Sequence, residues 1–246
     1  MARAADSHAG RKFFQRLNGA GFSRTRWPRS YALLDLAFEP LATVQAYNRI
    51  YSERMDPWEY LSNPQEHERY RMALAMLDGV RKRRRFASVL EAGCAEGAFT
   101  ELLAPLSESL LALDFCPLAL DRARNRCRWD GTVAFGLCDL RRQSPPGEFE
   151  LVTAMDLLSA FRRPTVMRAV FEKLAAAIRP QGYLLVTEHR QHPAFEDAWW
   201  ARRLLRGGRW IVSALAKHPS LVQIQSLQTD THVLALFHRR NLPARS

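Results

Sequence analysis

The residues with the clearest chemical potential form a glycine loop between a short apolar run and a helical stretch. The segment reads Val89-Leu90-Glu91-Ala92-Gly93-Cys94-Ala95-Glu96-Gly97-Ala98. Glycine tolerates backbone angles that other residues resist, so such a loop lets a ligand approach the main chain closely. A dinucleotide site needs the spacing G-x-G-x-x-G, which is not met here, and the acids Glu91 and Glu96 would repel a pyrophosphate. The loop therefore favours a cationic ligand.

Two further acids follow the next apolar runs. Asp114 ends the run Leu110–Leu113, and Asp139 comes directly after Cys138. A carboxylate after the second strand of an open α/β sheet accepts hydrogen bonds from ribose hydroxyls and disfavours a 2′-phosphate. Asp139 is placed to accept from an adenine amino group. With the cation-tolerant loop, this combination predicts a site for S-adenosylmethionine, which carries a sulfonium and an ammonium.

The elements that must position these residues alternate between strands and helices. Apolar runs predict strands at 88–90, 110–113, 133–137, 151–154 and 183–187, and helical spacing predicts helices at 99–106, 118–127 and 165–178. This alternation indicates a doubly wound, mostly parallel sheet with helices on both faces, a Rossmann-like α/β fold. Residues 221–226 and 231–237 predict an antiparallel C-terminal hairpin at the sheet edge.

The residues before the sheet predict helices. Apolar residues recur at helical spacing between positions 31 and 52, and Pro40 is expected to begin a helix there. Asn63 is a good N-cap, Pro64 suits the first helical position, and Glu66 stands where a capping box has its acid. We expect that second helix to end near Val80.

The first residues are basic, with Asp6 the one acid before residue 30, and they predict a partly flexible arm or an organelle transit peptide. We divide the chain into a basic, helical N-terminal extension over 1–40 and a catalytic domain over 41–240. Within that domain we expect a helical cap over 41–85, a cofactor-binding half over 86–188, and an acceptor-side lid with edge strands over 189–240.

The composition excludes several classes of protein. A chain of 246 residues with 47% hydrophobic residues can bury a full core, so it is not mainly disordered. No apolar run reaches the ~18–20 residues that a membrane span needs. The four cysteines form no C-x-x-C pair and are expected to be reduced thiols of a cytoplasmic protein. No zinc-like ligand spacing is visible, so no metal site is predicted.

The basic excess, a formal net charge of +11, has several readings. It is compatible with nucleic acid, an anionic membrane surface, an acidic small substrate or a solvated arginine-rich surface. The run Arg81-Lys82-Arg83-Arg84-Arg85 is interpreted either as a solvated helix end or as a phosphate-binding patch.

The glycine loop, Asp114, Asp139 and the turn at 178–183 together resemble class I S-adenosylmethionine-dependent methyltransferases over about residues 88–188. Two upstream motifs, Asp56-Pro57-Trp58 and Asn63-Pro64 with Glu68-Arg69-Tyr70, resemble the nodulation-type (NodS-like) N-methyltransferases, as does the loop itself. That subfamily methylates an amine of a chito-oligosaccharide, and relatives methylate other small molecules.

The resemblance implies roles for individual residues. It implies that Trp58 lies against the cofactor and that Arg69 holds its carboxylate. A guanidinium can grip a carboxylate with two parallel hydrogen bonds, and a tryptophan face attracts a sulfonium. The whole set of expected cofactor-binding residues is Trp58, Arg69, Glu91, Gly93, Cys94, Ala95, Gly97, Asp114, Phe115, Asp139, Leu140 and Met155.

Candidate proton acceptors follow the fourth and fifth predicted strands. Methyl transfer is an in-line displacement in which the acceptor loses a proton, and a hydroxyl acceptor needs a general base. After the fifth strand stand Glu188, His189 and His192, and His189 is the first candidate because histidine titrates near neutrality. Asp156, after the fourth strand, is either a base or a contact to the cofactor or acceptor. Trp199, Trp200 and Trp210 stand among arginines, a pattern that predicts a lid helix or a surface that stacks on sugars or bases.

Three functions follow from this sequence. The first is an S-adenosylmethionine-dependent methyltransferase acting on an amine or hydroxyl of a small-molecule acceptor, such as a sugar derivative. The second is an RNA methyltransferase with nucleic acid as its partner, motivated by the basic charge. The third is a non-catalytic binding module with a methyltransferase-like fold. In the resembling nodulation enzymes an acidic-then-aromatic segment follows the fourth strand, whereas residues 154–161 contain no tyrosine pair, which leaves the acceptor open.

Overall fold

A seven-stranded sheet organises the part of the chain that the computed structural model describes, residues 44–128, 131–161, 164–190 and 207–241. The strand order is β3-β2-β1-β4-β5-β7-β6. Strands β1 to β5 run parallel, and β7 lies antiparallel between β5 and β6. Their bounds are Val89–Ala92 (β1), Leu110–Asp114 (β2), Val133–Leu137 (β3), Phe149–Met155 (β4), Ile178–His189 (β5), Leu221–Gln228 (β6) and His232–Arg239 (β7).

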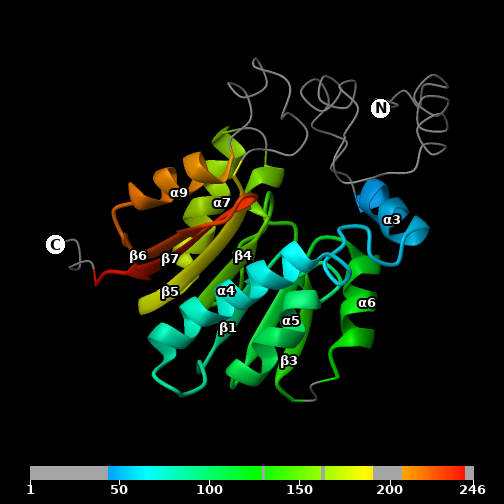
Figure 1. Ribbon diagram of the computed structural model, residues 1–246, viewed down its shortest axis with the longest axis horizontal. Coiled ribbons are helices and arrows are strands. Elements are labelled where there is room, and N and C mark those ends of the chain that lie inside the picture. Colours follow the sequence, from blue (N-terminus) through cyan, green and yellow to red (C-terminus); the bar gives the residue numbers. More distant parts are fainter. Residues whose placement is uncertain (1–43, 129–130, 162–163, 191–206, 242–246) are drawn as a thin grey trace.

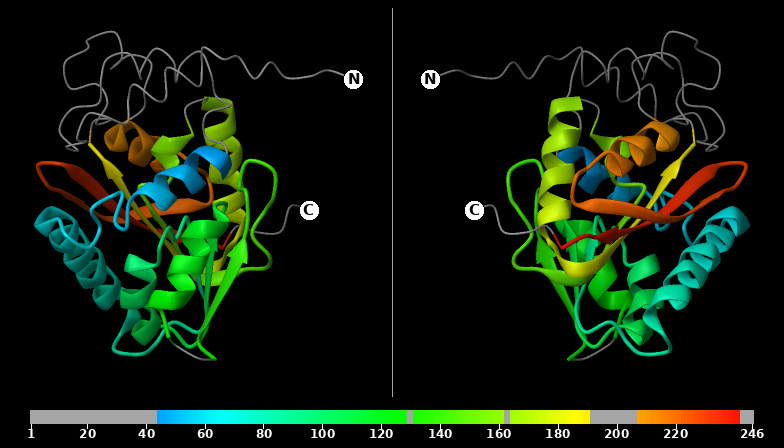
Figure 2. Two further views of the ribbon diagram at one scale, coloured as in Figure 1. Left: turned by 90° about the vertical axis from the view of Figure 1, so that its right-hand side faces the viewer. Right: turned by 90° about the vertical axis from the view of Figure 1, so that its left-hand side faces the viewer.

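Helices cover both faces of this sheet (Figures 1 and 2). Helices α4, α5 and α6 pack on one face, α7 and α9 on the other, and α3 packs on α6. The bounds are Val44–Glu53 (α3), Pro64–Arg81 (α4), Ala98–Leu103 (α5), Pro117–Arg126 (α6), Pro164–Ala176 (α7) and Gly208–Ala216 (α9), with short 3-10 turns at Ala104–Leu106 (η2) and Leu158–Ala160 (η3). The predicted doubly wound fold and its antiparallel edge hairpin are confirmed.

Burial follows from this two-sided cover. Every residue of β1 is buried, and β4 is buried from its second residue onward, because strands covered on both faces need continuous apolar runs. The outermost strand β6 is different: its central residues are exposed, and 47% of the Ile224 side chain faces solvent. The ends of the neighbouring strands β2, β1 and β4 are therefore buried within the sheet.

The sequence located the elements well and misplaced some of their ends. The helix expected at 165–178 ends at Ala176, because Ile178 already pairs with Phe149 and opens β5. Asn63 caps α4 as predicted, with Oδ1 accepting from the Gln65 N–H at 2.9 Å. Glu66 does not complete a capping box, since its carboxylate turns to Arg69 instead.

Several expectations lie outside the described residues. They are the basic extension over 1–40, the helix start at Pro40, and most of the lid, which falls within 191–206. Within the described residues no helix is long and apolar enough to cross a membrane.

Candidate functional site

The glycine loop joins β1 to α5 and has the strained backbone that its glycines permit. Gly93 and Gly97 have φ angles of 75° and 81°, in the left-handed region where a Cβ is disfavoured. The Leu113 carbonyl accepts from the N–H groups of Gly93 and Cys94, at 2.8 and 2.9 Å, which ties the loop to the end of β2. A Cβ on Gly93 would lie 2.9 Å from Leu157 Cδ1, so the main chain passes closely under the residues that follow β4.

Asp114 lies where the prediction needs it, at the carboxyl end of β2 beside the glycine loop. Its Oδ2 accepts from the Ala95 N–H at 2.9 Å, and its Oδ1 accepts from the Cys116 N–H at 2.9 Å. Burial raises the pKa of this carboxyl, while backbone N–H groups oppose the shift. Each carboxylate oxygen keeps a second lone pair, so Asp114 can also accept from a ligand's hydroxyl groups.

The two acids of the loop segment are buried and contact side chains of the helices α5 and α6. The Thr100 hydroxyl donates to Glu91 Oε2 at 2.5 Å, and burial raises the pKa of Glu91 to about 8. Glu96 is also buried, with Arg122 3.3 Å from its Oε2, and burial raises its pKa to about 7. At neutral pH the fully buried Glu91 is mainly uncharged, so the negative charge of the site comes from Asp114 and Asp156 rather than from Glu91.

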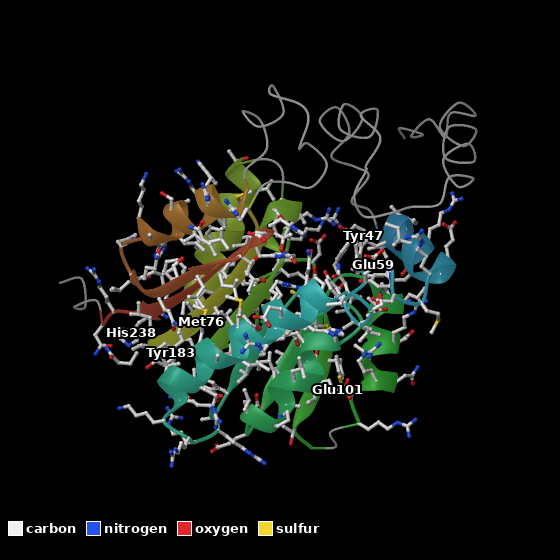
Figure 3. All side chains as sticks on the ribbon, in the orientation of Figure 1. Tyr47, Glu59, Met76, Glu101, Tyr183 and His238 are labelled. Atoms are coloured by element: carbon white, nitrogen blue, oxygen red, sulfur yellow. The ribbon has the colours of Figure 1, made fainter. Side chains whose placement is uncertain are left out.

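An aromatic group, formed by Tyr47, Tyr51, Trp58 and Phe115, lies beside Asp114. The Trp58 indole N–H donates to the Tyr51 hydroxyl at 2.8 Å, and the ring centroids of Tyr47 and Phe115 are 4.7 Å apart in an edge arrangement. Asp56 holds the turn before α4, accepting from the N–H groups of Tyr60, Leu61 and Ser62. Figure 3 labels Tyr47 on α3, near the strand ends.

The remaining predicted cofactor residues lie at the ends of β3 and β4. Asp139 pairs with Arg141, whose Nε lies 2.8 Å from Asp139 Oδ1, and Asp139 keeps 22% of its side chain exposed. Leu140 and Met155 are buried, and Cys94 is buried within the loop. Burial raises the pKa of the Cys94 thiol well above its ordinary value, so it is a small apolar residue rather than a nucleophile.

Arg69 does not stand free at the site. It is fully buried on α4, donates to Glu66 Oε2 through Nε and Nη2 at 3.0 and 2.5 Å, and donates to the Thr187 hydroxyl at 2.6 Å. Asp156 Oδ2 lies 3.3 Å from Arg69 Nη1. The guanidinium is therefore already neutralised by two acids, and the carboxylate-holding role implied by the resemblance stays a prediction.

Asp156 and His189 lie together with a histidine that the sequence did not single out, His232 of β7. Asp156 Oδ2 is 3.4 Å from His232 Nε2, and the rings of His189 and His232 have centroids 4.0 Å apart. Burial opposes ionisation of Asp156, but Arg69, His189 and His232 hold the pKa of Asp156 well below its usual range. The two predicted catalytic residues thus share one buried cluster with Arg69.

This cluster brings together ligand atoms from elements far apart in the chain. One oxygen of Glu66 and one ring nitrogen each of His189 and His232 lie within 4.8 Å of one another. Sequence spacing could not show this group, because His232 joins it through the antiparallel pairing His189↔His232. His232 lies in the predicted edge-hairpin strand 231–237 and Thr187 in the predicted strand 183–187, and the sequence assigns neither residue a role at the site.

Two residues of the basic run at the end of α4, Arg81 and Arg84, form ion pairs within the protein. Arg81 pairs with Asp78 at 2.5 Å, and Arg84 pairs with the buried Glu150. These contacts favour the reading of a helix end over that of a phosphate-binding patch.

Comparison with known proteins identifies the family. The model of the nodulation protein S (NodS) family matches residues 45–200, more than half of the chain. The chain belongs to the NodS family. This membership confirms the resemblance to the nodulation-type family that the glycine loop and the upstream motifs carry.

Individual relatives agree with this assignment. Nodulation protein S of Bradyrhizobium diazoefficiens is 35% identical over 130 residues, which are 53% of this chain and 61% of that protein. A ubiquinone biosynthesis O-methyltransferase of Xanthomonas euvesicatoria is 30% identical over 44% of this chain and 45% of that protein. This NodS-family chain thus matches between 45% and 61% of the length of these two curated relatives.

A solved structure shares the fold. The N-methyltransferase NodS of Bradyrhizobium japonicum WM9, in complex with S-adenosyl-L-homocysteine, aligns with a TM-score of 0.68 at 24% identity and covers 80% of this chain and 98% of its own. That likeness supports the Rossmann-like architecture derived above from strand order and register.

Proposed function

We propose that this protein transfers the methyl group of S-adenosylmethionine to an amine or hydroxyl of a small-molecule acceptor. The observation that carries the proposal is Asp114, a buried carboxylate fixed by backbone N–H groups on both sides, at the adjoining carboxyl ends of β1 and β2. In open α/β sheets this is where nucleotides bind, and a carboxylate there selects an unmodified ribose.

The residues around Asp114 suit the rest of the cofactor. Phe115, Tyr47 and Trp58 offer aromatic faces for an adenine and a sulfonium. Asp139 keeps part of its carboxylate accessible beyond β3. The loop allows the cofactor to approach the main chain closely at Gly93, Cys94, Ala95 and Gly97. The apolar walls of the cofactor site would come from Leu140 and Met155. Glu91, being buried beneath the loop, supports the loop through Thr100.

The methionine end of the cofactor would meet the Asp156 cluster. Both oxygens of the Asp156 carboxylate are buried and have no hydrogen-bond partner among the described residues, and such orphans point to a missing ligand, ion or water. Asp156 follows β4 beside the glycine loop, since Leu157 approaches Gly93. This carboxylate suits an ammonium, whereas Arg69 would hold a carboxylate by exchanging contacts with Glu66.

His189 is the proposed general base, with Asp156 as its electrostatic support. His189 ends β5 next to the end of β4 and is partly exposed, so its ring can reach an acceptor above the strand ends. When bound, S-adenosylmethionine supplies an activated methyl group on its sulfonium. The chain's own tasks are to orient the acceptor, exclude water and take up one proton.

The acceptor is proposed to be small, with an amine favoured over a hydroxyl. The solved relative is named an N-methyltransferase, while another relative is an O-methyltransferase, and both kinds of acceptor remain within the proposal. A cytoplasmic location is part of the proposal, supported by the four free, buried cysteines.

Calorimetric titration with S-adenosylmethionine and S-adenosyl-L-homocysteine tests the cofactor. We expect micromolar binding by the wild type and a loss of about 1.5–3 kcal/mol in Asp114→Asn, the range for a hydrogen bond to a charged group. Asp121→Asn is the matched control, because Asp121 is exposed on α6 and pairs only with Arg124 in the described structure. Labelled methyl transfer to amino sugars and then to phenols tests the acceptor. A folded wild type that binds neither cofactor form would contradict the proposal.

A further inference from the structure

Two histidines with adjacent rings, His189 and His232, belong to the cluster around Arg69. His189 on β5 and His232 on β7 are paired in the antiparallel register, and their rings are tilted by 37° with centroids 4.0 Å apart. His232 is fully buried, with 1% of its surface exposed. Its Nδ1 lies 2.9 Å from the Thr231 hydroxyl, which leaves Nε2 pointing at Asp156.

Asp156 is held in an unusual position facing that nitrogen. Its φ angle of 51° lies in the left-handed region, which costs a non-glycine residue energy and is found at functional sites. Its Oδ2 lies between His232 Nε2 at 3.4 Å and Arg69 Nη1 at 3.3 Å. Neither Asp156 oxygen nor His232 Nε2 has a hydrogen-bond partner among the described residues, so the two side chains face each other unsatisfied.

The charges of the cluster do not balance without a further proton. The charges of Glu66 and Arg69 on α4 neutralise each other, since Arg69 Nη2 lies 2.5 Å from Glu66 Oε2. The Asp156 carboxylate faces the same guanidinium at 3.3 Å, so one positive charge is divided between two carboxylates. Burial raises the pKa of the neighbouring Glu188 to about 8, so Glu188 is mainly neutral at pH 7. Tyr60, also packed here, has a pKa raised well above its ordinary value by burial, so it carries no charge. Because buried charges are almost always paired, the described residues of the cluster call for one more positive charge when no cofactor ammonium lies against Asp156.

We propose that His232 supplies this charge as the protonated partner of Asp156 and acts as a positioning residue that keeps the stacked His189 neutral. Two imidazolium rings 4.0 Å apart beside Arg69 would repel one another, so one proton is shared between the pair. His232 holds it because its Nε2 faces Asp156 directly.

The consequence for catalysis rests on the proposed function. A neutral His189 can accept the proton that the acceptor loses when its nitrogen or oxygen bonds to the methyl carbon. The sulfur keeps the electron pair of the broken carbon–sulfur bond. Since the imidazolium of His232 opposes a second charge, His189 then releases the proton readily to water.

A metal ion is the competing occupant of this cluster. Glu66, His189 and His232 offer three ligand atoms within 4.8 Å. However, Glu66 is already held by Arg69 through two hydrogen bonds, and the guanidinium charge opposes a cation at this position. The observations therefore favour a proton over a metal.

Nitrogen-15 NMR of the histidine rings in the whole chain tests the assignment without any variant. We expect His232 to carry both ring protons from pH 5 to pH 8 while His189 is neutral above its titration midpoint. In His232→Gln we expect the midpoint of His189 to rise by about one pH unit or more, since a like charge has been removed and Asp156 is freed. If methyl transfer is detected, the acid limb of kcat/KM should move by the same amount.

His238→Gln is the matched control. His238 lies on the same strand, at the other end of β7 from His232, and pairs with Tyr183. Figure 3 labels His238 and Tyr183 side by side. It should leave the midpoint of His189 unchanged. A neutral His232 in the wild type, or tight Zn²⁺ binding that His232→Gln abolishes, would overturn the proposal. Absence of methyl transfer with His232 protonated would instead reject the proposed function alone.

Discussion

The Arg122 guanidinium lies 3.3 Å from the buried carboxylate of Glu96 and thereby joins helix α6 to the glycine loop. The same side chain donates to the carbonyls of Tyr51, Arg54 and Met55, at the end of α3. One arginine thus fixes the loop and the segment that leads to Trp58. The aromatic group and the glycine loop are held in place relative to each other by this contact.

We expect Arg122→Ala to weaken cofactor binding by about tenfold or more, because a loss of 1.4 kcal/mol already corresponds to that factor. The variant would remove the ion pair of Glu96 with Arg122 and the hydrogen bonds from Arg122 to three main-chain carbonyls. Calorimetric titration with S-adenosyl-L-homocysteine measures the change. Arg124→Ala is the control, since Arg124 on the same helix pairs with the exposed Asp121. Equal affinities of the two variants would refute this joining role.

Gly97 is required by both its backbone angle and its surroundings. Its φ is 81°, and an added Cβ would lie 3.0 Å from Ala123 Cβ and 3.1 Å from Ala123 Cα on α6. Gly131 has nearly the same φ, 79°, with nothing within 4 Å of its Cβ position. We expect Gly131→Ala to cost about 1–2 kcal/mol in unfolding free energy, the left-handed backbone penalty, and Gly97→Ala to cost more. Urea denaturation of both variants measures the two losses of unfolding free energy. Equal losses would show that the contact of an added Cβ with Ala123 costs nothing.

The cofactor half of the fold could be predicted because its signals are local. Buried parallel strands are continuous apolar runs, and the glycine loop, Asp114 and Asp139 each stand directly at a strand end. The predicted β3 even has the bounds that the structure gives it, Val133–Leu137.

The acceptor side could not be predicted in the same way. His232 reaches Asp156 only through the pairing of β7 with β5, a non-local contact that no spacing in the chain encodes. Nor could the sequence show that Arg69 is neutralised, because Thr187 and Asp156 lie far from it along the chain. The position of Glu66 predicts a capping residue, but Glu66 is buried next to Arg69 and its carboxylate pairs with the guanidinium instead.

Helix α4 offers two acid–arginine pairs with one spacing and opposite environments. Glu66 and Arg69 are buried, with 2% and 1% of their side chains exposed, whereas Glu68 and Arg71 expose 50% and 71%. Removing one partner of a buried ion pair costs about 3–5 kcal/mol, because the remaining charge is left unpaired. An exposed pair is worth about 0–1 kcal/mol.

We therefore expect Arg69→Met to lower the unfolding free energy by about 3–5 kcal/mol and Arg71→Met by less than about 1 kcal/mol. Chemical denaturation at pH 7 measures both. Restoring the balance with Glu66→Gln on the Arg69→Met background should recover part of the loss. Similar losses in the two single variants would show that burial does not decide the strength of these pairs.

Glu91 makes the stability of the protein depend on pH. Burial raises its pKa from an ordinary 4.5 to about 8, against the opposing hydrogen bond from Thr100. A carboxyl whose pKa is higher in the folded state than in the unfolded state binds more protons when folded, so the folded protein is stabilised at acid pH and loses this stabilisation as pH rises from about 4.5 to about 8. Glu91→Gln keeps the shape and an acceptor for Thr100 while removing the titration.

We expect the melting temperature of the wild type to fall between pH 5 and pH 8 and that of Glu91→Gln to fall less, so that the variant gains relative stability toward pH 8. Differential scanning fluorimetry across this range measures the difference. Glu101→Gln is the control, because Glu101 is exposed on α5; Figure 3 labels this residue. A pH-independent difference between Glu91→Gln and the wild type would mean that Glu91 is already ionised in the folded protein, and its carboxylate would then contribute negative charge beneath the loop.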